Sequence, residues 1–286
     1  MVKRTFVGIQ AHPHDFVHEG TGNAIENMQE IGGVNAVLPY VCYFHERHPI
    51  LGEFPHNPRT KVYYSEGGVY FEPHLEYYRD TKVKPARTPE PDLKTFDVLL
   101  EVTKEARARE MKTYAWVHYT HRLEAKEHPD CIIIDILGRR VPEYGFFGRD
   151  LRSETWMCYN NPHVKNFVLG IYEDITRSYD IDGIFVDFET QPINHGGFEN
   201  PEIGFTCFCE YCISKMKDQG IDVEKVRRSL KEMAKEIRNL KSSQFLRVKD
   251  MTFLDAIRLL IKYPEFLAWL KFKCDNITEY TRDIYN

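Results

Sequence analysis

Short apolar runs alternate with amphipathic stretches along the first two thirds of the chain. The apolar runs have strand length and are followed by polar or turn-forming residues, and they predict strands at 5–10, 35–41, 112–118, 154–159 and 179–186. Between them, apolar residues recur every three to four positions and predict helices at 20–31, at 91–110 and from Pro162 onward. This alternation of strand and helix is typical of a parallel α/β fold.

The lengths of the loops between predicted strands and helices indicate at which end of the strands a functional site is expected. Segments after predicted strands are long, notably 42–91, 119–153 and the cysteine-bearing loop 190–212, whereas segments before strands are short. In parallel α/β folds the functional face is the carboxyl end of the strands, where the long loops lie. We therefore expect a single domain over 1–286 of the (β/α)8 TIM-barrel type. An open five-stranded sheet is the alternative.

The last third of the chain predicts helices only, at 208–219, 222–240, 252–261 and 264–285. The last of them shows no stop signal before Asn286. About five βα units are too few to close an eight-stranded barrel. The sequence thus predicts an incomplete barrel, as expected of a chain that is truncated at its C-terminus.

The net charge and the hydropathy of the chain argue against some classes of binding partner and some cellular locations. A net charge of −5 over 286 residues gives no electrostatic reason to expect nucleic acid or an anionic membrane surface. No window approaches about 18 uninterrupted apolar residues, and the N-terminus lacks the apolar core of a signal peptide. The 7 cysteines are an odd number without a secreted context, which favours metal ligation over a disulfide framework. We expect a cytoplasmic protein.

Two carboxylates, Asp187 and Glu189, follow the apolar run 184–186. Residues at this spacing point to the same side of a strand. At the end of a barrel strand, one acid can keep its proton as general acid while the other stays ionised to hold substrate or to stabilise an oxocarbenium-like transition state. The alternative is an ordinary solvated strand end.

Three cysteines, Cys207, Cys209 and Cys212, are clustered within six residues. Tetrahedral zinc takes four ligands, and a site closed by cysteines is structural and not catalytic. Cys158, at the end of the preceding predicted strand, is the first candidate for the fourth ligand, and Cys131 and Cys42 are the others. Buried or free thiols without a metal are the alternative.

Histidines follow two of the predicted strands. His12 and His14 lie at the end of the first strand, and His118 and His121 at the end of the third, so their side chains can reach one cleft. Hydrogen bonding of sugar hydroxyls is the function we favour for His12, His14 and His118, together with Tyr119 and Asn160. Trp116 and Tyr119 are candidate stacking platforms, although Trp116, in the middle of a predicted strand, can equally be a packed core ring. A histidine and carboxylate metal site with Asp187, or ordinary loop contacts, are the alternatives.

Several segments resemble a known group of proteins: CYNNPHV at 158–164, DGIFVDFE at 182–189 and CFCEYC at 207–212. They look like the TIM-barrel glycoside hydrolases related to the family 42 beta-galactosidases and the hypothetical glycosyl hydrolases grouped near them. The segment 263–283 is similar to the helix after the cysteine cluster in those proteins, and HPDC at 128–131 to one of their loops. The likeness covers about 110–286.

The resemblance implies a (β/α)8 barrel, a zinc-binding cysteine loop and retaining hydrolysis with two carboxylates. The family places an Asn-Glu pair where this chain has Asp187-Phe188-Glu189, so Glu189 is the expected acid/base and Asp187 the second choice, or the nucleophile in an amylase-like arrangement. The family's nucleophile lies on a later strand that these residues do not include.

The sequence therefore predicts a glycoside hydrolase-like protein with a structural zinc ion, a carbohydrate substrate and, from the family, a homo-oligomeric state. Two other classes stay open, a metal-dependent hydrolase of deacetylase type and a non-catalytic carbohydrate-binding barrel.

Overall fold

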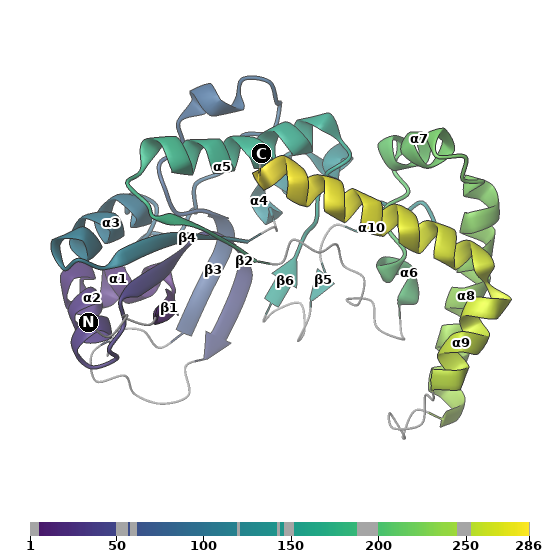
Figure 1. Cartoon of the computed structure of the whole chain (residues 1–286), viewed down its shortest axis with the longest axis horizontal. Coiled ribbons are helices and arrows are strands. Elements are labelled where there is room, and N and C mark those ends of the chain that lie inside the picture. Colours follow the sequence, from purple (N-terminus) through teal and green to yellow (C-terminus); the bar gives the residue numbers. More distant parts are fainter. Residues whose placement is uncertain are drawn as a thin grey trace.

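A computed structural model describes residues 6–49, 57, 62–118, 121–141, 144–145, 152–187, 200–244 and 253–285. The chain forms an α/β part from its N-terminal half and a helical part from its C-terminal third (Figure 1). The final helix, α10 (Pro264–Tyr285), runs back from the helical part toward α5 (Pro162–Ser178) and so connects the two (Figure 1).

Four parallel strands form the centre of the α/β part, in the order β1 (Gly8–Ala11), β2 (Ala36–Pro49), β4 (Lys112–His118) and β7 (Gly183–Asp187). Helices α1 (Pro13–Glu19), α2 (Thr21–Glu30), α3 (Val98–Ala108) and α5 lie between them in the chain. Each strand therefore lies beside the next parallel strand of the chain, which confirms the predicted parallel α/β architecture. A closed barrel remains a prediction.

The predicted strand at 154–159 is not a strand of the parallel sheet. β6 (Arg152–Glu154) pairs antiparallel with the outer half of β2 and with the two-residue strand β5 (Tyr144–Gly145). Residues 155–159 lie instead against the earlier segment 131–133, because Cys158 N–H donates to Cys131 O (2.8 Å) and Ile133 N–H donates to Trp156 O (3.1 Å). All five residues are buried, and continuous burial gives the same apolar pattern as a central strand.

The predicted loop 42–91 contains regular structure. β2 continues to Pro49 and pairs antiparallel with β3 (Val62–Val69), and the 3-10 helix η1 (Leu75–Tyr78) follows. Gly68, near the end of β3, lies against the backbone of the segment around residue 86. Its φ is +94°, and a Cβ there would lie 2.5 Å from the backbone oxygen of Ala86, so only glycine fits.

Helix caps account for where two helices begin. The side chain of Asp97 accepts a hydrogen bond from Leu100 N–H (3.0 Å), so α3 begins after Asp97 and not at 91 as predicted. A capping box of His12 and Asp15 starts α1, a helix that we did not predict. As a result His14 lies in a helix and not in a loop.

A buried carboxylate fixes α4 (Arg122–Glu127) to the chain near 86. Glu124 is fully buried, and its Oε1 accepts a hydrogen bond from Ala86 N–H at 2.8 Å. Burial raises the pKa of Glu124 from 4.5 to about 7, although the Ala86 N–H acts in the opposite direction. The 3-10 helix η2 (Pro129–Cys131) follows α4.

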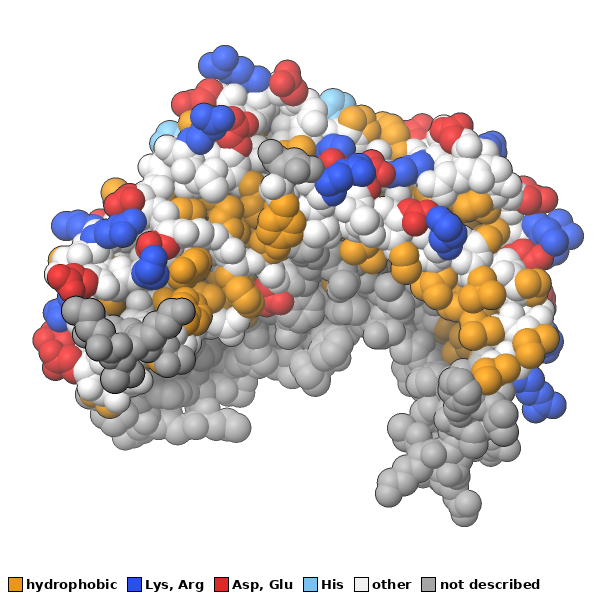
Figure 2. All heavy atoms as spheres, viewed as in Figure 1, with side chains coloured by type: hydrophobic (Ala, Val, Ile, Leu, Met, Phe, Trp, Pro, Cys, Tyr) orange, Lys and Arg blue, Asp and Glu red, His pale blue; other side chains and the backbone are white. Residues whose placement is uncertain are grey.

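The C-terminal third is helical as predicted, with α6 (Pro201–Gly204), α7 (Glu210–Asp218), α8 (Val223–Gln244), α9 (Phe253–Lys262) and α10. α10 packs mainly on α8. None of the described helices combines the length and apolarity needed to span a membrane. Apolar side chains gather on the face drawn in Figure 2, over the α/β part and along the helical part.

Candidate functional site

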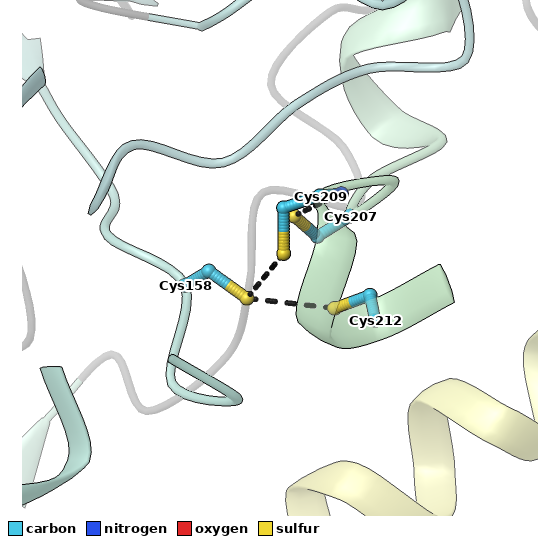
Figure 3. A group of neighbouring side chains, drawn as sticks. All are labelled: Cys158, Cys207, Cys209 and Cys212. Carbon is cyan, nitrogen blue, oxygen red and sulfur yellow. Dashed lines mark hydrogen bonds between the residues drawn. The ribbon is translucent and has the colours of Figure 1, made fainter. Parts of the chain in front are cut away.

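The sulfur atoms of Cys158, Cys207, Cys209 and Cys212 converge from two segments of the chain (Figure 3). All four lie within 4.8 Å of one another, and Cys158 Sγ is 3.4 Å from both Cys209 Sγ and Cys212 Sγ. Zinc–sulfur bonds of about 2.3 Å place the sulfurs of a tetrahedral site about 3.8 Å apart. The group therefore has the donor type, number and spacing that zinc requires. Among described residues, it is the one set of three or more His, Cys, Asp and Glu ligand atoms that could hold a metal.

Backbone hydrogen bonds hold two of these cysteines in place. The sulfur of Cys207 accepts from the N–H groups of Ile134 (3.3 Å) and Cys209 (3.4 Å), and Cys158 is fixed by its N–H bond to Cys131 O. Cys209 is the N-cap of α7, and Cys212 lies in the first turn of that helix. Hydrogen bonds among the thiols, and burial, raise the pKa of Cys158, so four thiolates together at this place require a cation.

The other candidates for the fourth ligand lie outside this group. Cys131 Sγ accepts a hydrogen bond from Asn161 Nδ2 at 3.5 Å. Cys42 is in the core, where burial raises its pKa. Cys158, the first candidate from the sequence, is the cysteine that the fold brings to the cluster.

A second group of polar and aromatic side chains lies at the carboxyl ends of the parallel strands. His118 and Asp187 end β4 and β7 and are opposite each other in register. The indole Nε1 of Trp116 donates a hydrogen bond to Asp187 Oδ2 (3.1 Å), and Tyr40 stacks on Trp116 with ring centroids 3.5 Å apart. A carboxylate is thus held beside two stacked rings. Tyr43 connects this group to the histidines, because its ring contacts those of His12 (5.1 Å) and His118 (6.2 Å).

The two N-terminal histidines are part of a buried hydrogen-bonded chain. Their rings stack at 4.9 Å, with Nδ1 atoms 3.0 Å apart, and His14 Nε2 lies 3.2 Å from Glu90 Oε2. Glu90 also accepts hydrogen bonds from the hydroxyls of Thr88 (2.8 Å) and Tyr70 (3.3 Å). Burial and the neighbouring His14 hold the pKa of His12 well below its usual value, so His12 is neutral near pH 7.

The structure separates the sequence-predicted residues into two places. His12, His14, His118 and Asp187 lie at the carboxyl ends of the strands, whereas Asn160 lies at the cysteine cluster, where its Nδ2 donates to Cys212 Sγ at 3.2 Å. Glu189 and Tyr119 lie outside the described residues.

Sequence reasoning missed Glu90 and the roles of Tyr40 and Tyr43. None of the three has a local signal. Glu90 lies in a Pro-rich segment far along the chain from His14, and tyrosines within an apolar strand are usually core residues.

The sequence matches no protein-family model and no curated protein. Among solved structures, it is similar to a noncanonic maltogenic alpha-amylase from Thermotoga neapolitana (13% identity, TM-score 0.38, 68% of this chain and 42% of the other). It is also similar to a beta-galactosidase from the psychrophilic Marinomonas ef1 (13% identity, TM-score 0.37, 96% of this chain and 36% of the other). A cycloisomaltooligosaccharide glucanotransferase from Paenibacillus sp. matches at 13% identity and a TM-score of 0.37, over 79% of this chain and 29% of the other.

The chain thus spans between 29% and 42% of the length of these structures. Similarity at these TM-scores assigns neither a family nor a function, and the relation to the family 42 beta-galactosidases stays a prediction.

Proposed function

We propose that the chain is a glycoside hydrolase-like, carbohydrate-active protein whose four clustered cysteines hold a structural zinc ion. The observation that carries the carbohydrate site is the carboxylate of Asp187, hydrogen-bonded to the indole of Trp116 beside the stacked ring of Tyr40. Aromatic rings stack on the C–H faces of sugars, and a carboxylate next to them is suited to hydroxyl binding or to acid/base chemistry at a glycosidic bond.

Glu189 is the acid/base in this proposal. Asp187 orients substrate, or acts as nucleophile if a second carboxylate lies about 5–5.5 Å away, as retention requires. His12 and His118 are buried and contact Tyr43, which packs on the Tyr40 ring beside Trp116. His14, also buried, stacks on His12. These positions suit the three histidines to hydrogen-bond sugar hydroxyls or to fix the groups that do.

The zinc ion would have a structural role. Its four ligands would be Cys158, Cys207, Cys209 and Cys212, so no coordination position is left for water or substrate. The ion would hold the segment 155–159 against the start of α7, and the binding free energy would stabilise the fold.

The carbohydrate proposal is tested on the intact, metal-loaded chain with a panel of aryl glycosides and oligosaccharides, in hydrolysis and in equilibrium binding. Glu189→Gln is expected to lower turnover by about 10²–10⁴-fold, the usual contribution of a general acid/base. Asp187→Asn should lower turnover as well, and Trp116→Leu should weaken binding because the indole N–H that holds the Asp187 carboxylate is lost. Asp275→Asn, on the exposed face of α10, is the matched control and should change nothing.

Three outcomes would contradict the proposed glycoside hydrolase function. Sugar binding without turnover, unchanged in Glu189→Gln, identifies a non-catalytic carbohydrate-binding protein. Turnover that chelation abolishes while the melting temperature stays constant identifies a metal-dependent hydrolase. No sugar binding and no turnover over the whole panel refutes the carbohydrate function.

A further inference from the structure

Helix α10 lies across the cysteine cluster and touches both segments that carry it. Near its C-terminal end, Tyr280 packs edge-on against Tyr159, the neighbour of Cys158, with ring centroids 4.3 Å apart. Near its N-terminal end, Trp269 packs edge-on against Phe205, two residues before Cys207, with ring centroids 5.6 Å apart. In Figure 3, α10 is the pale yellow helix at the lower right, on the side of Cys212. The part of α10 between these two contacts therefore faces the cluster.

Polar side chains occupy that part of the helix. Lys273 and Asn276 follow Trp269 at spacings of four and three residues, which places them on the same face of the helix as Trp269 and Tyr280. Both are buried, and Lys273 is 2% exposed. Within the described chain, Asn276 Oδ1 has no hydrogen-bond partner, and no carboxylate forms an ion pair with Lys273. Lys273 Nζ lies 5.9 Å from the ring centroid of Trp269, a cation–π contact that offsets only part of the cost of burying the charge. A buried ammonium group without a carboxylate therefore still needs another source of negative charge.

The metal site would supply that charge. Four cysteine thiolates and one divalent ion carry a net charge of −2, and the four sulfurs are themselves buried. Lys273 lies between Trp269 and Tyr280, the two residues of α10 that contact the segments carrying the cysteines. Burial lowers the pKa of Lys273, whereas negative charge on the four cysteines raises it. The charges of Lys273 and the loaded site are therefore complementary.

A second set of contacts joins α10 to the cluster through hydrogen bonds. Glu279 Oε2 accepts from Lys215 Nζ (2.6 Å), Lys215 Nζ also donates to Asn160 Oδ1 (3.0 Å), and Asn160 Nδ2 donates to Cys212 Sγ (3.2 Å). The carboxylate on α10 thereby fixes the orientation of the amide that stabilises the charge on one ligand. Removing a group that orients a metal ligand in this way commonly lowers metal affinity by about 10–100-fold.

We propose that α10 supplies the second coordination sphere of the four-cysteine site, with Lys273 as its buried counter-charge and Glu279 as the anchor of the Lys215–Asn160–Cys212 chain. The docking of α10 and the binding of the metal would then stabilise each other. The inference rests on the metal proposed above and is independent of the carbohydrate function.

The test measures metal affinity in the full chain. Apo protein is titrated with Co²⁺, whose absorption reports a four-thiolate site, and Zn²⁺ affinity is determined by competition with a chromogenic chelator. Lys273→Met is expected to weaken Zn²⁺ binding by about 10–100-fold, and Lys273→Arg to restore most of it, because the charge is kept. Glu279→Gln should weaken binding by about 3–10-fold, the worth of one hydrogen bond of ordinary strength. It should also shift the sulfur-to-cobalt absorption band, because Asn160 is released.

Lys271→Met is the matched control. It removes a lysine two positions away, on the exposed side of α10, where it pairs with Asp275 of the same helix. Wild-type affinity in Lys273→Met, or an equal loss in Lys271→Met, would overturn the proposal. If Lys273→Met does not fold, the test relies on Glu279→Gln, at a partly exposed position. Unchanged Zn²⁺ affinity and an unchanged Co²⁺ spectrum in Glu279→Gln would then contradict the inference. If the wild-type chain binds neither Co²⁺ nor Zn²⁺, the metal site itself is refuted. If the wild-type chain binds metal and the variants bind it equally well, only the role of α10 is refuted.

Discussion

Replacing Glu124 by Gln should stabilise the protein above pH 7 and have little effect near pH 5. Glu124 is fully buried in α4, and its Oε1 accepts a hydrogen bond from Ala86 N–H that a glutamine oxygen would keep. Its Oε2 is buried without a hydrogen-bond partner in the described part of the chain. Burial raises the pKa of this carboxyl group from 4.5 to about 7. The folded state therefore favours the protonated, uncharged form.

The sign of the effect follows from proton binding. Between pH 4.5 and about 7 the folded state keeps a proton that the unfolded state has lost, so the free energy of unfolding falls as the pH rises, and it levels off above about pH 7. One pKa unit corresponds to about 1.4 kcal/mol, so a difference of about 2.5 between the two states amounts to about 3 kcal/mol. Glutamine has no proton to lose, and the variant should regain about that amount at pH 8.

Urea unfolding of wild type and Glu124→Gln at pH 5 and pH 8, with metal present, measures the effect. Taking the difference between variant and wild type at each pH cancels contributions that both proteins share, such as protonation of the cysteines. Glu127→Gln, an exposed position of the same helix, is the control and should show a far smaller pH-dependent difference, because Glu127 makes only a minor contribution to the raised pKa of Glu124. An equal stability difference at both pH values for Glu124→Gln would refute a buried, protonated carboxyl group.

Three further changes test the fold and the metal site. Cys158→Ser should abolish stoichiometric zinc in metal analysis and lower the melting temperature by about 10 °C, about 3 kcal/mol for a chain of this size, whereas Cys274→Ser, at an exposed position, should do neither. Gly68→Ala should cost about 1–3 kcal/mol in urea unfolding, because its φ is +94° and the added carbon would meet a backbone oxygen at 2.5 Å. Gly138→Ala, with φ +82° and nothing within 4 Å, should cost less. Burial lowers the pKa of His121 from 6.5 to about 3, so stability should fall as the pH drops below 6.5, and His121→Gln should flatten this slope in acid titrations followed by circular dichroism.

The helices were largely predictable because their signals are local. Apolar spacing and caps predicted 264–285 and 208–219, and the structure places α10 at Pro264–Tyr285 and α7 at Glu210–Asp218. The errors concern elements that depend on distant partners. The segment 62–69 becomes a strand because the outer half of β2 offers it a partner, and 154–159 leaves the parallel sheet because the chain at 131–133 pairs with it instead.

The candidate site shows the same limit. The three cysteines of the loop form an obvious cluster, but the choice of Cys158 over Cys131 and Cys42 depends on how residues 155–159 fold back. Asn160 follows a predicted strand, so the sequence places it with the sugar-binding residues. In the fold it bonds to Cys212, and no feature of the sequence distinguishes those two roles.

The spacing of the four cysteines along the chain has a consequence for the order of folding. Three of the cysteines fall within one short segment, while Cys158 is separated from Cys212 by 54 residues, a stretch that includes α5 and β7. The nearby three can capture an ion as soon as their own loop forms. Cys158 can join only after a closure that costs entropy in proportion to the logarithm of its length, and a cross-link over that span restricts the unfolded chain by about 4 kcal/mol. The proposed ion would therefore bind the three loop cysteines before Cys158, and the last cysteine–metal bond would fix both ends of the segment that carries Asp187.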